Sequence, residues 1–391
     1  MNKPDVLIVG AGFAGAVSAR IFAENGKKVM ILERRNHIAG NAYDYLDDNG
    51  VLRHEYGPHI FHTSSREAEA FLSRFTDWFD YEHRVLGCIE GKLVPIPFNF
   101  TSIEMLFPQE KAKHLKDVLI SAYGMDHKVP ILELRKNEDP EIRELAEYIF
   151  EHVFKYYTMK QWGYSAEEID PSVTGRVPVM VSYDDRYFQD SFQKMPVNGF
   201  TALIEKILDH ENIEVKLNTE AMDHLSVDVP AKKVLYDGEV FDGIVIYTGL
   251  VDQLLNYASG DLPYRSLEFD VRSEKGQYQP VTTVNYPTPA SEHPYTRITE
   301  YKNMQYNPPK DKTTIAVEYP YAYDRKGEKG NVPYYPVFTD ASRARYQAYV
   351  DLIKDIPNLY LLGRLAEYKY YNMDAITEAA IHLAKEILDK E

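Results

Sequence analysis

One stretch near the N-terminus constrains the fold more than any other: residues 5–34 read DVLIVGAGFAGAVSARIFAENGKKVMILER. An apolar run is followed by a glycine turn, an amphipathic helix and a second apolar run that closes on Glu33. The spacing of Gly10, Gly12 and Gly15 permits a tight turn, close approach of a pyrophosphate and close helix packing. Glu33, 18 residues beyond Gly15, stands where an acid accepts the hydroxyls of a ribose. The stretch therefore predicts a βαβ unit that binds a dinucleotide.

Two later apolar runs extend this nucleotide-binding unit. VIYTG ends at Gly249 and LYLLGR ends at Arg364, as expected for strands that stop at the carboxyl edge of a parallel sheet. A helix is predicted to begin at Met373–Asp374, with its N-terminus facing an anionic ligand. This layout resembles FAD proteins related to glutathione reductase and the amine oxidases. FAD is favoured over NAD, because NAD alone would not need the late strand.

The chain of 391 residues is longer than one core usually supports, so we expect more than one domain. The predicted fold is α/β, with a discontinuous Rossmann-like FAD-binding domain, an inserted helical domain and an antiparallel β-sheet domain. The FAD-binding domain comprises residues 1–62, 196–258 and 338–391. The mainly helical domain, with a mobile substrate loop, covers residues 63–170. The antiparallel substrate domain covers residues 171–195 and 259–337.

Composition excludes several classes of protein. The net charge of −16 argues against nonspecific binding to nucleic acid, which depends on neutralising phosphates, although local arginines can still bind small anions. No apolar stretch is long enough to span a bilayer, and no basic segment with a cleavage site opens the chain. Cys88 is the only cysteine, which fits a reducing compartment. We expect a cytoplasmic protein without a nucleic-acid partner and without membrane insertion.

The segment GPHIFH, residues 57–62, places His59 and His62 three residues apart in an apolar, aromatic loop. Two imidazoles can share a metal ion, but a metal site needs further ligands, and the flanks offer only His54 and Glu55. Three interpretations remain open from these residues: a metal site, a packed structural role, and contact with substrate or cofactor.

Aromatic and basic residues gather in three further segments. YYTMKQWG, residues 156–163, is either an aromatic cluster that caps a helix or a platform for a planar base, with Trp162 on a mobile loop. GRVPVMVSYDDRYFQD contributes Arg176 and Tyr187, and PYTRITE contributes Arg297. An unpaired charge is costly in apolar or aromatic strands, so these arginines are expected to bind anions such as a nucleotide diphosphate.

The whole chain resembles the bacterial UDP-galactopyranose mutases. The motifs that carry the resemblance, in chain order, are GAGFAG, GPHIFH, YYTMKQWG, GRVPV, YDDRYF, PYTRITE, VPYYP and LLGRLAEYKYYNMD. The resemblance implies an isomerase that interconverts UDP-galactopyranose and UDP-galactofuranose and supplies galactofuranose for cell-surface polysaccharide. It further implies reduced FAD whose N5 forms a covalent adduct with sugar C1, with no net redox change. An external electron donor and a homodimer are implied as well.

The resemblance also assigns residues to the site. It implies catalytic roles for Arg176, Arg297, His59 and His62, with the histidines close to the isoalloxazine and the sugar rather than at a metal. The implied substrate-binding residues are Phe154, Tyr157, Thr158, Trp162, Arg176, Tyr187, Arg297, Tyr335, Tyr370 and Asn372. The implied cofactor-binding residues are Gly10, Gly12, Phe13, Ala14, Gly15, Glu33, Arg34, Gly40, Asn41, His59, Ile60, Gly363, Arg364, Tyr370, Met373 and Asp374. No metal is expected.

Asn372 departs from the family pattern, because many bacterial members have an aspartate at this position. A neutral amide replaces a charged acceptor near the expected diphosphate and sugar. The sequence therefore predicts the mutase reaction more firmly than it predicts which hexose reacts. UDP-N-acetylgalactosamine or a deoxyhexose nucleotide remains an alternative substrate. Two rival functions are a redox flavoenzyme of the amine oxidase type, which needs an apolar tunnel, and a noncatalytic nucleotide-binding protein.

Overall fold

The computed structural model describes residues 3–164 and 178–390. Its centre is a five-stranded parallel sheet in the order β12-β2-β1-β16-β22. These strands are β12 (Ile213–Lys216), β2 (Val29–Leu32), β1 (Val6–Val9), β16 (Ile244–Tyr247) and β22 (Leu359–Leu361). Strands from the start, middle and end of the chain thus lie side by side, and the expected α/β fold with a Rossmann-like domain is confirmed.

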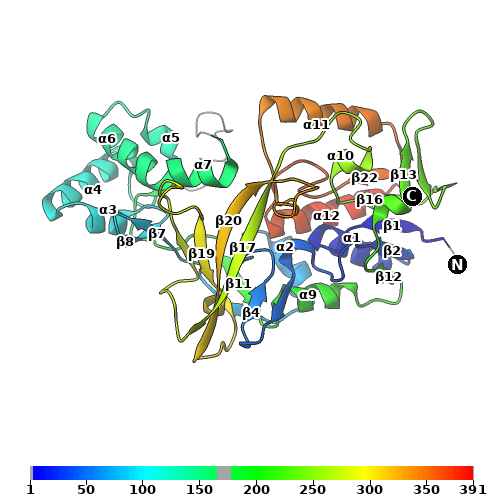
Figure 1. Cartoon of the computed structure of the whole chain (residues 1–391), viewed down its shortest axis with the longest axis horizontal. Helices are drawn as coiled ribbons and strands as arrows, with labels where there is room; N and C mark the ends of the chain where they lie inside the picture. The colour runs from blue at the N-terminus through cyan, green and yellow to red at the C-terminus, as the bar shows by residue number, and fades with distance from the viewer. Residues whose placement is uncertain (1–2, 165–177, 391) are drawn as a thin grey trace.

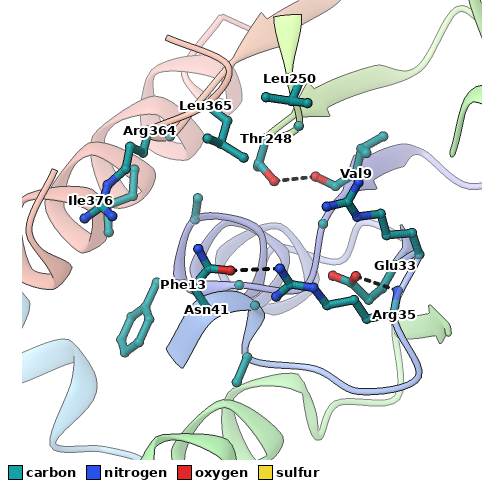
Figure 2. Close-up of a pocket in the computed structure, with 18 of the residues that line it drawn as sticks. Val9, Phe13, Glu33, Arg35, Asn41, Thr248, Leu250, Arg364, Leu365 and Ile376 are labelled. Atoms are coloured by element: carbon teal, nitrogen blue, oxygen red, sulfur yellow. Dashed lines mark hydrogen bonds between the residues drawn. The ribbon is translucent and has the colours of Figure 1, made fainter. Parts of the chain in front are cut away.

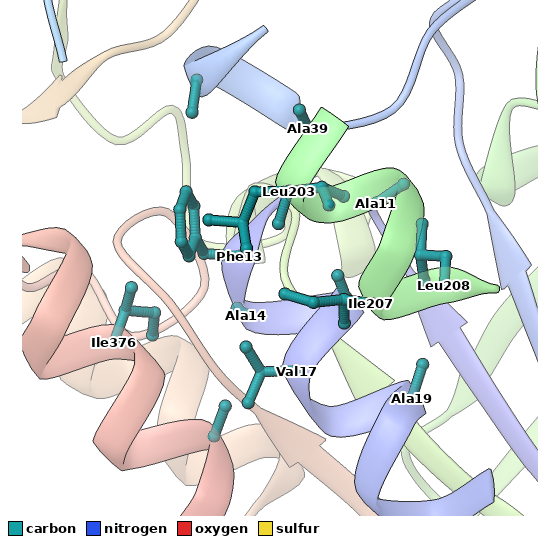
Figure 3. Packing of buried hydrophobic residues seen from close by; sticks show 14 of the residues in the cluster. Ala11, Phe13, Ala14, Val17, Ala19, Ala39, Leu203, Ile207, Leu208 and Ile376 are labelled. Carbon is teal, nitrogen blue, oxygen red and sulfur yellow. The ribbon is translucent and has the colours of Figure 1, made fainter. Parts of the chain in front are cut away.

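The sheet is covered on both faces, which explains why its strands are apolar throughout. Alternate residues point to opposite faces: Ile8 joins the core under one helical layer, and Leu7 joins the core on the other side. The first layer consists of α1 (Phe13–Glu24), α9 (Gly199–Leu208) and α12 (Met373–Leu388), whose apolar side chains interlock in Figure 3. The second layer contains α10 (Val251–Leu254), α11 (Asp340–Ile353), β13 (Leu225–Asp228), β14 (Lys233–Tyr236) and β15 (Glu239–Val240).

A second, seven-stranded sheet stands beside the nucleotide unit (Figure 1). Its order is β21 (Tyr335–Pro336), β17 (Tyr264–Lys275), β20 (Lys312–Ala322), β19 (Arg297–Glu300), β18 (Thr283–Asn285), β7 (Val85–Ile89) and β8 (Lys92–Ile96). The sheet is antiparallel except between β18 and β7, which run parallel. The β7–β8 hairpin comes from residues assigned by sequence to the helical domain, because a hairpin's sequence does not indicate which sheet it will join. The domain boundaries as such stay a prediction.

The helical unit projects from the far end of this sheet (Figure 1). It contains α3 (Phe100–Leu106), α4 (Gln109–Tyr123), α5 (Ile131–Leu134) and α6 (Pro140–Ile149), which pack around one apolar core, and α7 (Tyr156–Trp162). A π-helical turn, Phe150–Lys155, joins α6 to α7. Such turns often occur at functional sites, and this one leads directly into the YYTMKQWG segment. Within residues 3–164 and 178–390, no helix combines the length and apolar character that crossing a membrane requires.

Short elements connect these units. β5 (Phe61–Thr63) and β6 (Trp78–Asp80) flank β11 (Phe192–Pro196), β3 (Asp44–Leu46) pairs with β4 (Leu52–His54), and β9 (Lys128–Val129) pairs with β10 (Val179–Met180). Helix α2 (Arg66–Leu72) is capped by the Ser65 hydroxyl, which accepts from the Ala68 amide at 3.1 Å. Single-turn 3₁₀ segments occur at Gly40–Ala42, Ala221–Asp223 and Tyr301–Met304. β5 contains Phe61 and His62, the last two residues of the GPHIFH segment, and its pairing with β11 holds this end of the segment in place.

Candidate functional site

A pocket opens at the carboxyl edge of the parallel sheet, where β1, β2, β16 and β22 end (Figure 2). Of the residues predicted to bind cofactor, those that line it are Gly10, Gly12, Phe13, Ala14, Glu33, Arg34, Gly40, Asn41, His59, Gly363, Arg364 and Met373. Asn372, predicted to bind substrate, lines it too. Segments that are distant in sequence therefore converge on the edge where a parallel sheet of this kind binds nucleotides.

The glycine turn after β1 brings the chain close to itself. Gly10 has φ +98°, a conformation that favours glycine, and a Cβ built there would lie 2.3 Å from the Thr248 hydroxyl oxygen. A Cβ on Gly15 would lie 2.0 Å from the Gly10 carbonyl oxygen, so Gly15 does not line the pocket but lets α1 pack on the turn. The backbone itself forms this wall of the pocket.

Two helix N-termini face the pocket. Gly12 caps α1 and Asn372 caps α12, and neither cap makes a side-chain hydrogen bond to its helix. The first amide groups of each helix are therefore available to a ligand, and both helix dipoles place positive charge at the same cavity. Asp374, in the first turn of α12, accepts from the adjacent Ala375 amide at 2.8 Å. The arrangement is suited to a phosphate-bearing ligand.

Glu33 ends β2 inside the pocket and is only 6% exposed. One of its carboxylate oxygens accepts from the Ala11 amide at 2.9 Å and the other from the Arg35 amide at 2.9 Å. These bonds fix the carboxylate in place while leaving each oxygen a second lone pair for a ribose hydroxyl. Arg35 was not predicted; its guanidinium donates to Asn41 at 2.8 Å and lies 4.2 Å from the centre of the Tyr56 ring.

His59 reaches the pocket from the GPHIFH segment. Its Nδ1 lies 3.0 Å from the Gly57 carbonyl oxygen, which selects the tautomer with the proton on Nδ1 and leaves Nε2 as an acceptor. Burial, together with the neighbouring His54 and Arg364, lowers the pKa of His59 to about 3. His59 is therefore a neutral imidazole at physiological pH. Among the described residues, no group of three or more His, Cys, Asp or Glu is arranged to hold a metal ion.

Arg364 connects the pocket to an aromatic cluster. Its guanidinium donates to the carbonyl oxygens of Tyr334 at 3.2 Å and Tyr371 at 2.7 Å. The same group lies 4.9 Å from the ring centres of both Tyr335 and Tyr370, which stack on each other 6.1 Å apart. Tyr370 belongs to this cluster and does not line the pocket. The cluster thus begins where the nucleotide pocket ends.

Arg297 is the charged centre of the cluster. It lies opposite Glu318 in the β19–β20 pair, and its Nε donates to the Glu318 carboxylate at 2.8 Å. Burial works against the charge of Arg297, but Glu318, Tyr157 and Tyr335 more than offset it and hold the pKa of Arg297 well above its ordinary value. Glu318 is 1% exposed, so Arg297 is a fixed cation with donors left over for an anion.

The YYTMKQWG segment forms the opposite side of the cluster. It folds as α7, which places Tyr157 near Arg297, Tyr187 and Tyr335. The Trp162 ring lies 6.0 Å from that of Tyr335. Phe154 and Thr158 are both buried, Phe154 in the core of the helical unit. Arg176 lies outside the described residues.

His62 occupies a different environment from His59. Its Nδ1 lies 2.7 Å from a carboxylate oxygen of Asp190, and its ring stacks on Phe188 at 3.5 Å. His62 does not line the nucleotide pocket, and Ile60 packs against the core around α1. Tyr187 lies on the same loop, directly before Phe188, and its amide donates to the His83 carbonyl at 2.7 Å. Asp190 and Glu318 were not predicted, because nothing in the local sequence indicates the strand pairing that brings them to His62 and Arg297.

Further pocket residues were not predicted: Arg35, Thr248, Gln253, Tyr334, Leu365 and Ile376. Tyr334 was within reach of prediction, since it neighbours Tyr335 in the VPYYP motif. Thr248 follows β16 and donates to the Val9 carbonyl at 2.6 Å, a contact that depends on the pairing of β1 with β16. The roles of all these residues stay predictions.

Two family models match parts of the chain. The family model of UDP-galactopyranose mutase matches residues 152–370, and that of an NAD(P)-binding Rossmann-like domain matches residues 8–75. A probable UDP-galactopyranose mutase of Klebsiella pneumoniae is 36% identical over 389 residues, covering 99% of this chain and 96% of that protein. A dTDP-fucopyranose mutase of Escherichia coli is 34% identical, covering 98% of each chain.

Solved structures agree on the fold. The crystal structure of a reduced UDP-galactopyranose mutase superimposes with a TM-score of 0.73 at 17% identity, covering 100% of this chain and 95% of that one. At this identity the likeness shows the fold alone. With the family model matching more than half of the chain and a relative aligned over nearly its full length, the chain belongs to the UDP-galactopyranose mutase family.

Proposed function

We propose that the protein interconverts UDP-galactopyranose and UDP-galactofuranose as an FAD-dependent isomerase. The observation that carries this proposal is the join between the two parts of the site: Arg364 lines the dinucleotide pocket and also contacts the tyrosines around Arg297. A cofactor in the pocket and a nucleotide diphosphate at Arg297 would therefore meet. An amine oxidase would place an apolar tunnel here instead of a buried cation.

The residues of the pocket fit FAD. Backbone at Gly10 and Gly12 allows close approach of a pyrophosphate, two uncapped helix N-termini supply amide donors, and Glu33 presents oxygens for a ribose. The parallel sheet also includes the late strand β22, which the helix α12 follows in the chain. Binding of NAD alone would not require this late strand. When bound and reduced, the flavin supplies a nucleophile for the anomeric carbon.

The protein's own contribution is binding and charge stabilisation. Arg297, and by family resemblance Arg176, would bind the diphosphate and stabilise it as the sugar–phosphate bond breaks. Tyrosine hydroxyls from Tyr335 and Tyr370 would add donors, and the Tyr157 ring would stack on the uracil. His59, held neutral, could accept one hydrogen bond at Nε2 from the flavin or sugar without adding charge.

Four finer features are part of the proposal; the cytoplasmic location rests on composition, and the other three rest on the family resemblance. The enzyme would act in the cytoplasm as a homodimer, an external electron donor would keep the flavin reduced, and galactofuranose would enter cell-surface polysaccharide. An alternative hexose is retained, because Asn372 lines the pocket as an unusual neutral amide and a dTDP-fucopyranose mutase is 34% identical to the chain.

The proposal is tested by product analysis of the purified protein with UDP-galactofuranose, run with and without dithionite. Conversion to UDP-galactopyranose only in the reduced sample is the expected result. A parallel reaction with the furanose form of dTDP-fucose tests the alternative sugar. Steady, substrate-dependent reduction of oxidised flavin would instead identify a redox enzyme, and binding of UDP without turnover of either sugar would identify a noncatalytic nucleotide-binding protein.

A further inference from the structure

Lys160 makes an unusual set of contacts on α7. Its ammonium group donates to the carbonyl oxygens of Tyr286 at 2.7 Å, His293 at 2.9 Å and Tyr295 at 2.8 Å. All three ammonium hydrogens are therefore used, and every acceptor is a backbone carbonyl. These carbonyls belong to the segment 286–296, which connects β18 to β19 in the seven-stranded sheet.

The segment 286–296 is well ordered by its own contacts. The Tyr286 amide donates to the Thr296 carbonyl at 2.9 Å, and the Thr288 hydroxyl lies 2.8 Å from His293 Nδ1. The rings of Tyr286, His293 and Tyr295 pack on one another at 4.9–5.3 Å. Lys160 thus attaches α7 to a segment whose own hydrogen bonds and ring contacts hold its conformation.

The same segment leads directly into Arg297. Tyr295, whose carbonyl accepts from Lys160, is two residues before Arg297 at the start of β19. On the other side, Lys160 lies on the short helix that carries Tyr157 and Trp162. One side chain therefore spans the gap between the aromatic side and the cationic side of the candidate substrate site.

A second basic residue holds the end of the same helix. Arg265 on β17 donates through Nε to the Gln161 carbonyl at 2.8 Å and through Nη2 to the Lys160 carbonyl at 3.1 Å. Gly163 ends α7 with φ +75°, and a Cβ there would lie 2.8 Å from Nη1 of Arg265. Arg265 therefore fixes the end of the helix, while Lys160 fixes its distance from the β18–β19 connection.

We propose that Lys160 is a positioning residue that sets the separation between α7 and Arg297, and thereby the fit of a nucleoside diphosphate between them. This inference rests on the proposed function, since it takes the Arg297 cluster to be the diphosphate site. Lys160 does not touch the diphosphate in this scheme; it acts through the segment 286–296 and through α7.

The test compares Lys160→Met with Lys160→Arg in the FAD-loaded, full-length protein. Methionine keeps much of the length of the chain but removes all three donors, whereas arginine keeps a charged donor. Lys155→Met is the matched control, because Lys155 precedes the same helix and its ammonium group binds Glu151 four residues away, at 2.8 Å, rather than the segment 286–296. Flavin content, the Kd of UDP, and KM and kcat for UDP-galactofuranose are measured for each.

We expect Lys160→Met to raise the Kd of UDP and the KM about tenfold or more, with kcat and flavin content nearly unchanged. Lys160→Arg should recover much of the affinity, and Lys155→Met should match the wild type. Equal affinity in Lys160→Met and Lys155→Met would overturn the inference, as would parallel loss of flavin and UDP binding. Failure of the wild type itself to bind UDP or turn over the sugar would instead refute the proposed function.

A spectroscopic measurement keeps the test decisive if Lys160→Met is poorly folded. The chain has two tryptophans, Trp78 and Trp162, so Trp162 is the only one left in a Trp78→Phe background. Trp162 is 6% exposed. In that background, Lys160→Arg should keep the blue-shifted emission of a buried indole and Lys160→Gln should shift it to the red at a similar Tm. The same emission in both variants would contradict the positioning role.

Discussion

The nucleotide pocket and the Arg297 cluster lie next to each other but are built differently. The pocket is formed largely by backbone: a glycine turn, two helix N-termini and strand ends of one parallel sheet. The cluster is formed by side chains from α7, β19, β20, β21 and the loop before α12. Changes in the pocket should therefore act through steric exclusion, and changes in the cluster through lost charge and hydrogen bonds.

The largest effect is expected from Gly15→Ala. The new methyl carbon would lie 2.0 Å from the Gly10 carbonyl oxygen, so α1 and the turn could not keep their present distance. We expect the purified variant to lack nearly all flavin absorbance. Gly50→Ala is the control, because Gly50 has φ +75° with nothing within 4 Å of a Cβ. This variant should lower the free energy of unfolding by about 1 kcal/mol and retain flavin. Full flavin content in Gly15→Ala would contradict the backbone account of the pocket.

Arg297→Ala should leave flavin bound while lowering turnover by about two orders of magnitude, because it removes charge stabilisation of the leaving diphosphate. It should also lower the free energy of unfolding by about 3 kcal/mol, since Glu318 is left buried without its cation. Arg297→Lys, which keeps the charge, should recover most of the stability. We expect a similar kinetic loss for Arg176→Ala. Near-normal turnover in both alanine variants would refute the assignment of the cluster.

Trp162→Ala should weaken UDP binding about tenfold, because the indole is almost fully buried against Tyr335 and its loss opens that side of the cluster. Flavin content should not change. Trp78→Phe serves as the control, since Trp78 packs on Phe61 and Phe192 around β5 and β11. Isothermal titration with UDP gives both affinities; equal values would separate α7 from the substrate.

The smallest expected effect concerns acid stability. Burial lowers the pKa of His54 to about 3, and His59 behaves similarly, whereas an unfolded histidine titrates near pH ~6.5. The unfolded chain therefore binds more protons than the folded chain between these values, so stability falls as the pH drops through that window. Each histidine contributes a slope of about 1.4 kcal/mol per pH unit at most.

Urea unfolding at several pH values measures this slope. His54→Asn keeps an acceptor for the His59 amide. Between pH 6 and 4 it should reduce the slope of unfolding free energy against pH by up to about 1.4 kcal/mol per pH unit, the equivalent of one proton. An identical slope in His54→Asn and the wild type would show that His54 is not held neutral by the fold.

The same contrast explains what could be predicted from sequence. The pocket depends on local spacing: Gly10, Gly12, Gly15 and Glu33 occur within one βαβ unit, and the ends of β16 and β22 are recognisable as apolar runs that stop on glycine or just before it. The parallel sheet and the helices α1 and α12 were predicted for this reason. Their residues meet because adjacent parallel strands end at a common edge.

The cluster could be predicted only in part, because its partners are set by strand register. Arg297 was predicted to bind an anion because a charge in an aromatic strand needs a partner, but Glu318 faces it only because β19 and β20 pair in that register. Likewise Asp190 reaches His62 because β11 pairs with β5. The lysine at position 160 gave no signal, since its three acceptors are backbone carbonyls, which every sequence supplies.

The most direct measurement is a crystal structure of the dithionite-reduced protein with FAD and UDP bound. The account predicts the FAD pyrophosphate at the N-termini of α1 and α12, the UDP diphosphate within hydrogen-bond distance of Arg297, and the uracil against Tyr157. UDP bound away from Arg297, or a flavin outside the Gly10–Glu33 pocket, would contradict the division of the site into a backbone-built cofactor pocket and a side-chain-built substrate cluster.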